Sequence, residues 1–261
     1  MRRRRSSAVG LLAALGLAAG GLTGCSSVMS AGSIQGVRSD PDHQGLVVSY
    51  LGGGCDGPVR LKLKETPTRI DADLVMGPGG GGTCAAVGYP RTVTARLAQP
   101  IGKRTIWSGG DEQIPFDGAD LLVPTDLPQG FAAPSESGDG DGWSPDPEAA
   151  VATSTWTTQW SPEKTAGAAG ECRPTRGELA IRLGPGSTNR YLGSTKVGTA
   201  RIGAATASIY RLGSSRRPVG WAYVWTRGRL GVELASSATC RGDQPLDRTD
   251  LLRVARSLRP A

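Results

Sequence analysis

Glycine and proline interrupt this chain too often for it to form long helices. Its 261 residues include 39 glycines and 18 prolines, and both residue types destabilise a helix interior. A helical bundle or a coiled coil is therefore excluded. Between these breaks lie short stretches of alternating apolar and polar residues, such as 59–64, where Val, Leu and Leu alternate with Arg, Lys and Lys. This period of two predicts half-buried β-strands, here with a basic solvent-exposed face.

The alternation predicts two β-rich domains, at residues 43–131 and 151–261. Strands are expected near 46–50, 59–64, 70–74, 93–97 and 104–107 in the first, and near 153–160, 179–183, 197–212, 219–226 and 230–235 in the second. Gly203 divides the 197–212 stretch into two strands or one bulged strand. The predicted fold class is mainly β, with a small disulfide-clamped β-sandwich followed by an α+β C-terminal domain.

One helix is predicted, at the C-terminus. Asp247 is a suitable N-cap, with Asp250 three residues later. An apolar stripe follows at Leu251, Val254, Ala255 and Leu258. The second domain is therefore expected to be an antiparallel sheet backed by a C-terminal helix.

An acidic linker is predicted between the two domains, at residues 132–150. It carries five acidic residues and no basic ones: Glu136, Asp139, Asp141, Asp146 and Glu148. Its Gly-, Pro- and Ser-rich composition cannot bury a core, so we expect disorder or a loop that lies on a partner surface.

The N-terminus has the layout of an export signal. Four arginines precede an apolar run, Ala8 to Leu22, that is too short to remain as a membrane span. The run ends in Leu22-Thr23-Gly24-Cys25, which resembles the lipobox of bacterial lipoproteins: an aliphatic residue, two small residues and a cysteine. The sequence leaves the export route, Sec or twin-arginine, open.

The lipobox resemblance implies a processed and lipidated N-terminus. Residues 1–24 are the signal peptide, cleavage falls between Gly24 and Cys25, and Cys25 carries diacylglycerol as the mature N-terminus. The chain is then anchored on the extracytoplasmic face of the cell membrane, with residues 25–42 as a lipidated tether. Tether, cysteine-containing β domain and Trp-rich domain together resemble uncharacterised exported lipoproteins of high-GC Gram-positive bacteria.

The four other cysteines predict two disulfides, because an even number in an exported chain favours bridges. They are Cys55, Cys84, Cys172 and Cys240. Of the three possible connectivities, we favour Cys55 with Cys84 and Cys172 with Cys240, since each pair then lies within one domain. No CxxC motif is present, which disfavours a zinc or redox site.

Charge is concentrated in the second domain, where residues 151–261 hold 17 basic and 7 acidic residues. Near a membrane, such a domain is attracted to anionic lipid or an anionic envelope polymer. The compartment disfavours nucleic acid as a partner. The alternative is that the arginines only solubilise the domain. We expect Arg248, Arg253, Arg256 and Arg259 near an exposed basic surface.

Aromatic residues alternate on one predicted strand at Trp221, Tyr223 and Trp225. These rings form either a binding platform or the core of the sheet beneath the helix. The candidate binding residues are therefore these three aromatics together with Arg253 and Arg256.

Catalytic and metal-binding patterns are absent from the sequence. His43, the only histidine, lies at the end of the predicted tether, a poor place for a buried base. We expect no cofactor, no metal and no enzymatic activity. The predicted function is a binding or interaction module with a membrane, polymer or protein partner. Two alternatives stay open: a carrier of an apolar ligand in the C-terminal domain, and an envelope glycan hydrolase using paired carboxylates such as Asp71 and Asp73.

Overall fold

The computed structural model describes residues 34–80, 88–139, 155–163, 177–185, 194–214, 217–238 and 243–261. Their regular structure is almost entirely strand, with one α-helix near the C-terminus, which confirms the predicted mainly β class and the C-terminal helix. Residues 31–261 cluster by their contacts into one compact unit. The predicted signal peptide, the cleavage site at Gly24 and the lipidation site at Cys25 lie outside the described residues.

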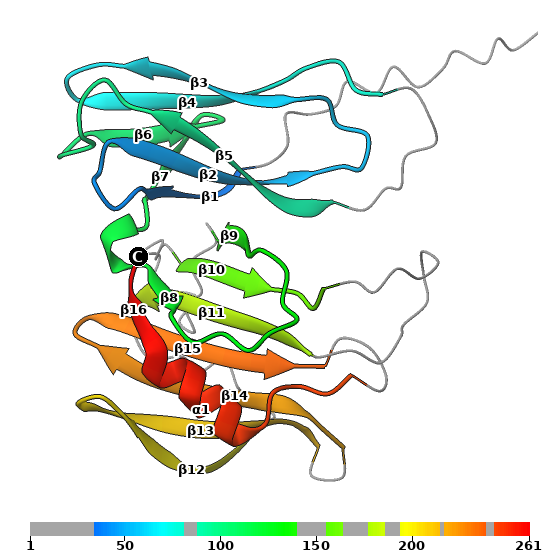
Figure 1. The fold of residues 1–261 in the computed structure, drawn as a ribbon. Helices are drawn as coiled ribbons and strands as arrows, with labels where there is room; N and C mark the ends of the chain where they lie inside the picture. The colour runs from blue at the N-terminus through cyan, green and yellow to red at the C-terminus, as the bar shows by residue number, and fades with distance from the viewer. Residues whose placement is uncertain are drawn as a thin grey trace, which may run out of the picture. The chain divides into compact units, whose positions relative to one another are not determined.

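Two facing sheets form the N-terminal sandwich (Figure 1). A three-stranded sheet has the order β1 (Ile34–Ser39), β2 (Gly45–Gly52), β5 (Tyr89–Arg96), and a four-stranded sheet has the order β3 (Val59–Glu65), β4 (Arg69–Met76), β6 (Thr105–Ser108), β7 (Asp111–Gln113). Neighbouring strands are antiparallel except for β4 and β6, which are parallel.

Alternate residues of these strands meet in one core. Leu46, Val48 and Tyr50 from β2 pack in the same buried cluster as Ile70 from β4 and Ile106 from β6. On β3 the apolar residues are half-buried and the intervening Arg60, Lys62 and Lys64 are exposed, as the alternation predicted. The sheets therefore cover each other and leave a charged outer face on the four-stranded sheet.

The first strand lies inside the segment predicted to be a tether, so this part of the tether prediction is wrong. β1 pairs with β2 over Ser39 to Ile34, and Val37 is buried in the sandwich core. Arg38 and Ser39 are buried too, because the rest of the fold supplies their polar partners. A strand whose polar residues face inward shows no apolar alternation, and the sequence pattern missed it for that reason.

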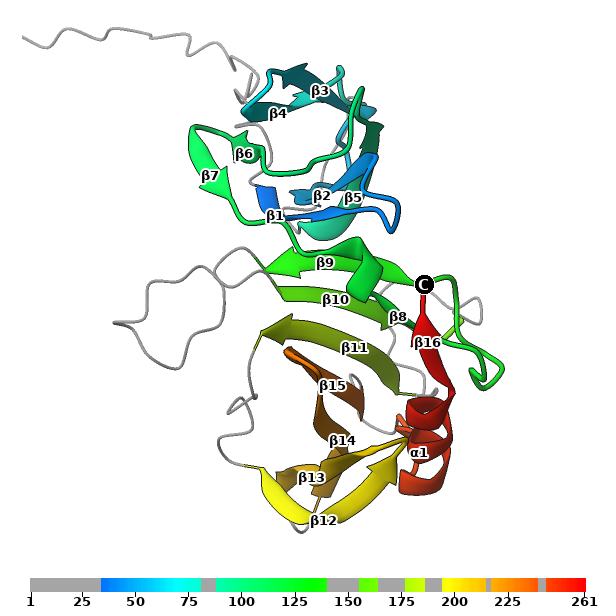
Figure 2. The ribbon, with the colours of Figure 1, turned by 90° about the vertical axis from the view of Figure 1, so that its left-hand side faces the viewer.

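A seven-stranded antiparallel sheet forms the C-terminal part (Figure 2). Its order is β12 (Thr195–Ile202), β13 (Ala205–Ser214), β14 (Arg217–Arg227), β15 (Leu230–Ser237), β11 (Glu178–Pro185), β10 (Thr155–Trp160), β9 (Ser135–Asp139). β12 and β13 are two strands joined at Gly203, whose φ of 58° favours glycine. α1 (Arg248–Ser257) contacts β12, β14 and β15, and a two-stranded ribbon pairs β8 (Leu122–Pro124) with β16 (Leu258–Pro260).

Part of the predicted linker is also a strand. Ser135–Asp139 form β9 at the edge of the seven-stranded sheet, paired with β10; residues 140–150 lie outside the described part of the chain. Glu136 of β9 accepts hydrogen bonds from Arg38 Nε at 2.8 Å and from Trp156 Nε1 at 3.0 Å. The Arg38 guanidinium also lies 5.2 Å from the Trp156 ring centroid. Composition alone suggested disorder here, but these long-range polar contacts hold the strand.

Of the four cysteines predicted to form disulfides, the structure describes one. Cys55 is disulfide-bonded. Cys84, Cys172 and Cys240 lie outside the described residues. The pairing of all four therefore stays a prediction.

Candidate functional site: an arginine surface at the C-terminal helix

The C-terminal helix begins where the sequence predicted. The Asp247 carboxylate accepts hydrogen bonds from the backbone N–H groups of Thr249 at 2.8 Å and Asp250 at 2.9 Å, which satisfies two donors that the first turn leaves unpaired. Asp250 adds a negative charge near the positive end of the helix dipole. With ten residues, α1 is too short to cross a bilayer, and no described helix is long and apolar enough to do so.

The apolar face of α1 is fully used in packing. Leu251 and Val254 are 0% exposed, and they belong to the same buried cluster as side chains of β11, β14 and β15. Leu258, which follows the helix, is buried in that cluster as well. These side chains therefore fill the space between α1 and the sheet. The carrier alternative requires an enclosed apolar cavity at this place.

Four arginines, three on α1 and one on β16, lie on the outer surface of this region. Arg248, Arg253, Arg256 and Arg259 are all exposed. Their surroundings differ. Arg253 lies between two carboxylates, with Nε 3.4 Å from Asp126 and Nη2 3.2 Å from Asp250. Its charge is balanced locally, so of the two arginines proposed for binding, Arg253 is the less suitable.

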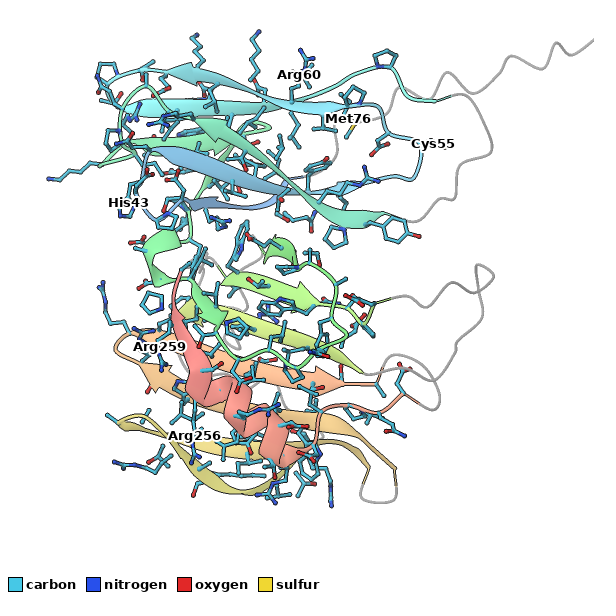
Figure 3. The ribbon with its side chains drawn as sticks, in the orientation of Figure 1. His43, Cys55, Arg60, Met76, Arg256 and Arg259 are labelled. Carbon is cyan, nitrogen blue, oxygen red and sulfur yellow. The ribbon has the colours of Figure 1, made fainter. Side chains whose placement is uncertain are left out.

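Arg256 and Arg259 instead bind carbonyl oxygens. Arg256 Nε donates to the carbonyl of Arg201 on β12 at 3.3 Å. Arg259 Nη1 donates to the carbonyls of Arg256 at 3.0 Å and Leu258 at 2.8 Å, at the end of the helix where carbonyls lack helical partners. Figure 3 shows Arg256 on α1 and Arg259 beyond its end.

These contacts gather three positive charges. We call the exposed residues Arg201, Arg256 and Arg259 the arginine surface. In the part of the chain that the structure describes, none of the three pairs with a carboxylate. Each guanidinium has five N–H donors, and the contacts above consist of one hydrogen bond from Arg256 and two from Arg259. The remaining donors are available to an anionic partner. Sequence reasoning missed Arg201 because it lies 55 residues before Arg256.

The aromatic candidates lie in the core and not on a platform. Tyr223 is 1% exposed and Trp225 is 7% exposed, whereas Trp221 is half-buried against the same cluster. The Tyr223 hydroxyl donates to the carbonyl of Arg248 at 2.9 Å, and the Arg248 guanidinium lies 5.6 Å from the Trp221 ring centroid. Burial raises the pKa of the Tyr223 hydroxyl. These residues join β14 to the start of α1.

The only histidine of the chain lines a separate hollow of about 430 Å³ together with Ser39 and Asp117. His43 has a φ of 59°, and its Nδ1 lies 3.7 Å from Asp117 Oδ1. Ser39 Oγ accepts a hydrogen bond from Gly118 N at 2.8 Å. Among the described contacts no hydrogen bond joins Ser39 to His43, so a nucleophile and its base are not assembled there.

Metal binding finds no support within the described ranges, where no three His, Cys, Asp or Glu side chains lie close enough together to hold an ion. Comparison with known protein families gave no match, and neither did comparison with curated protein sequences.

Proposed function

We propose that this protein is a membrane-anchored lipoprotein of the cell envelope that acts as a binding module, with the arginine surface as its contact to phosphate-bearing anions. The lipobox ending in Cys25 supports the anchor. The observation that carries the binding role is the grouping of Arg201, Arg256 and Arg259 without a paired carboxylate in the described structure. Guanidinium groups match the geometry of phosphate oxygens better than ammonium groups do.

The proposed anchor and the first described strand are close in sequence. The first described strand begins at Ile34, nine residues after Cys25, whereas the sequence pattern placed the start of the first domain near residue 43. Nine residues can span at most about 30 Å. A lipid on Cys25 would thus keep the folded unit within reach of phospholipid headgroups and of polymers close to the membrane.

The test uses the soluble chain from residue 26 with its disulfides formed. Its co-sedimentation is compared on vesicles of phosphatidylcholine with and without phosphatidylglycerol. The variant Arg201→Gln/Arg256→Gln removes two charges from the arginine surface, and its affinity for the anionic vesicles should fall about 30-fold, at roughly 1 kcal/mol per arginine. Arg259 is left intact because its guanidinium holds carbonyls at the end of the helix.

A matched control removes two charges elsewhere. Arg60→Gln/Lys103→Gln changes exposed residues of the N-terminal sheets, and it should weaken binding much less because salt screens charges that do not touch the membrane. Equal losses in the two double variants would show a net-charge effect and reject a localised surface. Binding of soluble inorganic polyphosphate but not of vesicles would identify a phosphate polymer, and not lipid, as the source of the anion.

A further inference from the structure

A second candidate site lies on the outer face of the four-stranded sheet, far in sequence from the arginine surface. A hollow of about 350 Å³ is lined there by Lys62 and Lys64 of β3, by Arg69, Asp71 and Asp73 of β4, and by Trp107 of β6. We call it the Trp107 hollow. Its volume falls in the range of small-ligand sites in proteins.

Strand register brings these residues together. Lys64 lies opposite Asp71 in the β3–β4 pairing, and Asp71 lies opposite Trp107 in the parallel β4–β6 pairing. Side chains opposite one another on adjacent strands point to the same face of a sheet. The alternate residues Leu61 and Ile70 belong to the sandwich core. Three strands thus contribute one transverse row of functional groups on the outer face.

The aromatic ring of the hollow is held in place. Trp107 Nε1 donates to Thr105 Oγ1 at 3.2 Å, and the Arg69 guanidinium stacks on the Trp107 ring with its Cζ atom 4.4 Å from the ring centroid. Arg69 Nε in turn donates to Asp71 Oδ1 at 2.5 Å. Groups that are already fixed lose little conformational entropy when a ligand binds, which favours affinity.

The lysines and aspartates of the hollow do not form the cross-strand ion pairs that the strand register would permit. Lys62 faces Asp73 and Lys64 faces Asp71, positions where opposite charges normally pair. In the described structure neither couple forms an ion pair, and Asp71 binds Arg69 instead. The hollow therefore offers N–H donors and carboxylate acceptors side by side.

The turn from β6 to β7 leaves one rim of the hollow open. Gly109 and Gly110 have φ values of 62° and 96°, and a Cβ added at either would meet no atom within 4 Å. A two-residue Gly-Gly turn of this kind joins strands without placing a side chain over the site.

The charge balance of the hollow selects against a polyanion. Three cationic side chains face two carboxylates, and Glu112 pairs opposite Trp107 on β7. A ligand with both hydrogen-bond donors and acceptors fits this lining, because hydroxyl groups do both. An indole adds an apolar surface with a polar rim around it. A sugar ring, with apolar C–H groups and a rim of hydroxyls, combines these properties.

We propose that the Trp107 hollow binds a neutral saccharide. The hollow is independent of the arginine surface and of the lipid anchor, and only the source of the saccharide, a polysaccharide of the envelope, rests on the proposed function. Lys62, Lys64 and Asp73 supply the hydrogen bonds to hydroxyls. Trp107 and the Arg69 stacked on it form the wall against which the sugar packs.

The test applies the full-length lipoprotein, purified in detergent, to an array of neutral and acidic bacterial oligosaccharides, and then titrates the strongest neutral hit by isothermal calorimetry. We expect binding to neutral oligosaccharides. Trp107→Ala should weaken it at least about tenfold, as expected on removal of a tryptophan anchor. Asp73→Asn, which changes an exposed side chain and leaves the sheet intact, should also weaken it.

Arg201→Gln/Arg256→Gln is the matched control and should bind the saccharide like the wild-type chain. Circular dichroism checks that Trp107→Ala is folded; if it is not, Asp73→Asn and Lys62→Gln carry the test. The proposal is overturned if no neutral oligosaccharide binds, if only acidic ones bind, or if the hollow variants bind undiminished. Because vesicle binding is measured separately, failure here leaves the arginine surface untouched, and the reverse also holds.

Discussion

The N-terminal sheets of this protein cover each other, whereas the seven-stranded sheet packs against the C-terminal helix together with residues of the β8–β16 ribbon. On β3, a strand that covers a core, every second residue faces outward, so Lys62 and Lys64 form a regular row with the aspartates of β4 beside it. On α1 the outward residues are spread by the helical period. Arg253 then falls between two carboxylates and Arg256 beside Arg201. The periodicity of the outer element therefore determines which charged side chains become neighbours. On β3 it places lysines beside aspartates, and on α1 it places Arg256 beside Arg201.

The largest expected effect on stability compares a leucine beneath α1 with a leucine on β3. Leu251→Ala empties a position that is 0% exposed beneath α1, and it should cost about 3 kcal/mol of unfolding free energy. Leu63→Ala on β3 removes a half-buried side chain and should cost about 1 kcal/mol. Urea unfolding of the oxidised chain measures both. A smaller loss for Leu251→Ala than for Leu63→Ala would contradict the role of α1 as the cover of the sheet.

The next effect concerns the contact that joins β1 to β9. Glu136→Gln removes the charge that faces Arg38, whose side chain is only 11% exposed. Breaking a largely buried pair in this way should lower the unfolding free energy by about 2 kcal/mol. The same urea experiment tests it. Wild-type stability in this variant would mean that β9 is not held by Glu136.

Two carboxyl groups should respond to pH in opposite directions. Hydrogen bonds from the backbone of Ala98, at 2.8 Å, and from Arg104, at 2.7 Å, lower the pKa of Glu65 in the sandwich. Its contribution to stability is therefore present above the ordinary pKa of a glutamate and is lost as the pH falls through the lowered folded-state pKa. Burial raises the pKa of Glu178 in the seven-stranded sheet. Its contribution is present at low pH and is lost as the pH rises through the raised pKa.

Amide variants measure these contributions. Glu65→Gln should destabilise the protein at neutral pH and flatten the loss of stability on acidification. Glu178→Gln should stabilise it at neutral pH. Thermal unfolding between pH 3 and pH 7 follows both. Identical pH profiles for the two variants would show that the sandwich and the seven-stranded sheet do not differ in this respect.

The smallest effect is expected at Arg253. Its side chain is 52% exposed, and the side chains of its partners Asp126 and Asp250 are 51% and 44% exposed. Exposed ion pairs contribute little, so Arg253→Gln should change the unfolding free energy by less than about 0.5 kcal/mol. It should also leave vesicle binding nearly unchanged, because Asp126 and Asp250 already balance this charge. Vesicle binding that falls as far as in Arg201→Gln/Arg256→Gln would extend the arginine surface to Arg253.

Local patterns predicted the elements whose stability is decided locally. The Asp247 cap and the apolar stripe of α1 are signals within one segment, and the exposed basic face of β3 follows from simple alternation. The sequence pattern missed β1 and β9 because Arg38 and Glu136 are polar residues that face inward. They do so because they pair with each other, although they lie 98 positions apart in the chain. No local pattern carries that information.

The candidate sites show the same limit. The alternation of Trp221, Tyr223 and Trp225 predicted that they share a face, but only the position of α1 determines that this face is the core. Exposure of Arg256 was predicted from the helix, whereas its neighbour Arg201 comes from β12. Trp107 gave no signal of its own, since the hollow is assembled by register across three strands.

Mass spectrometry of the N-terminal peptide, from chain purified out of its own membrane, tests the anchored module most directly. We expect a peptide that begins at Cys25 and carries the mass of a diacylglyceryl group, and a Cys25→Ala variant that loses this modification and the membrane association. An unmodified Cys25, or a mature chain that begins at another residue, would contradict the account.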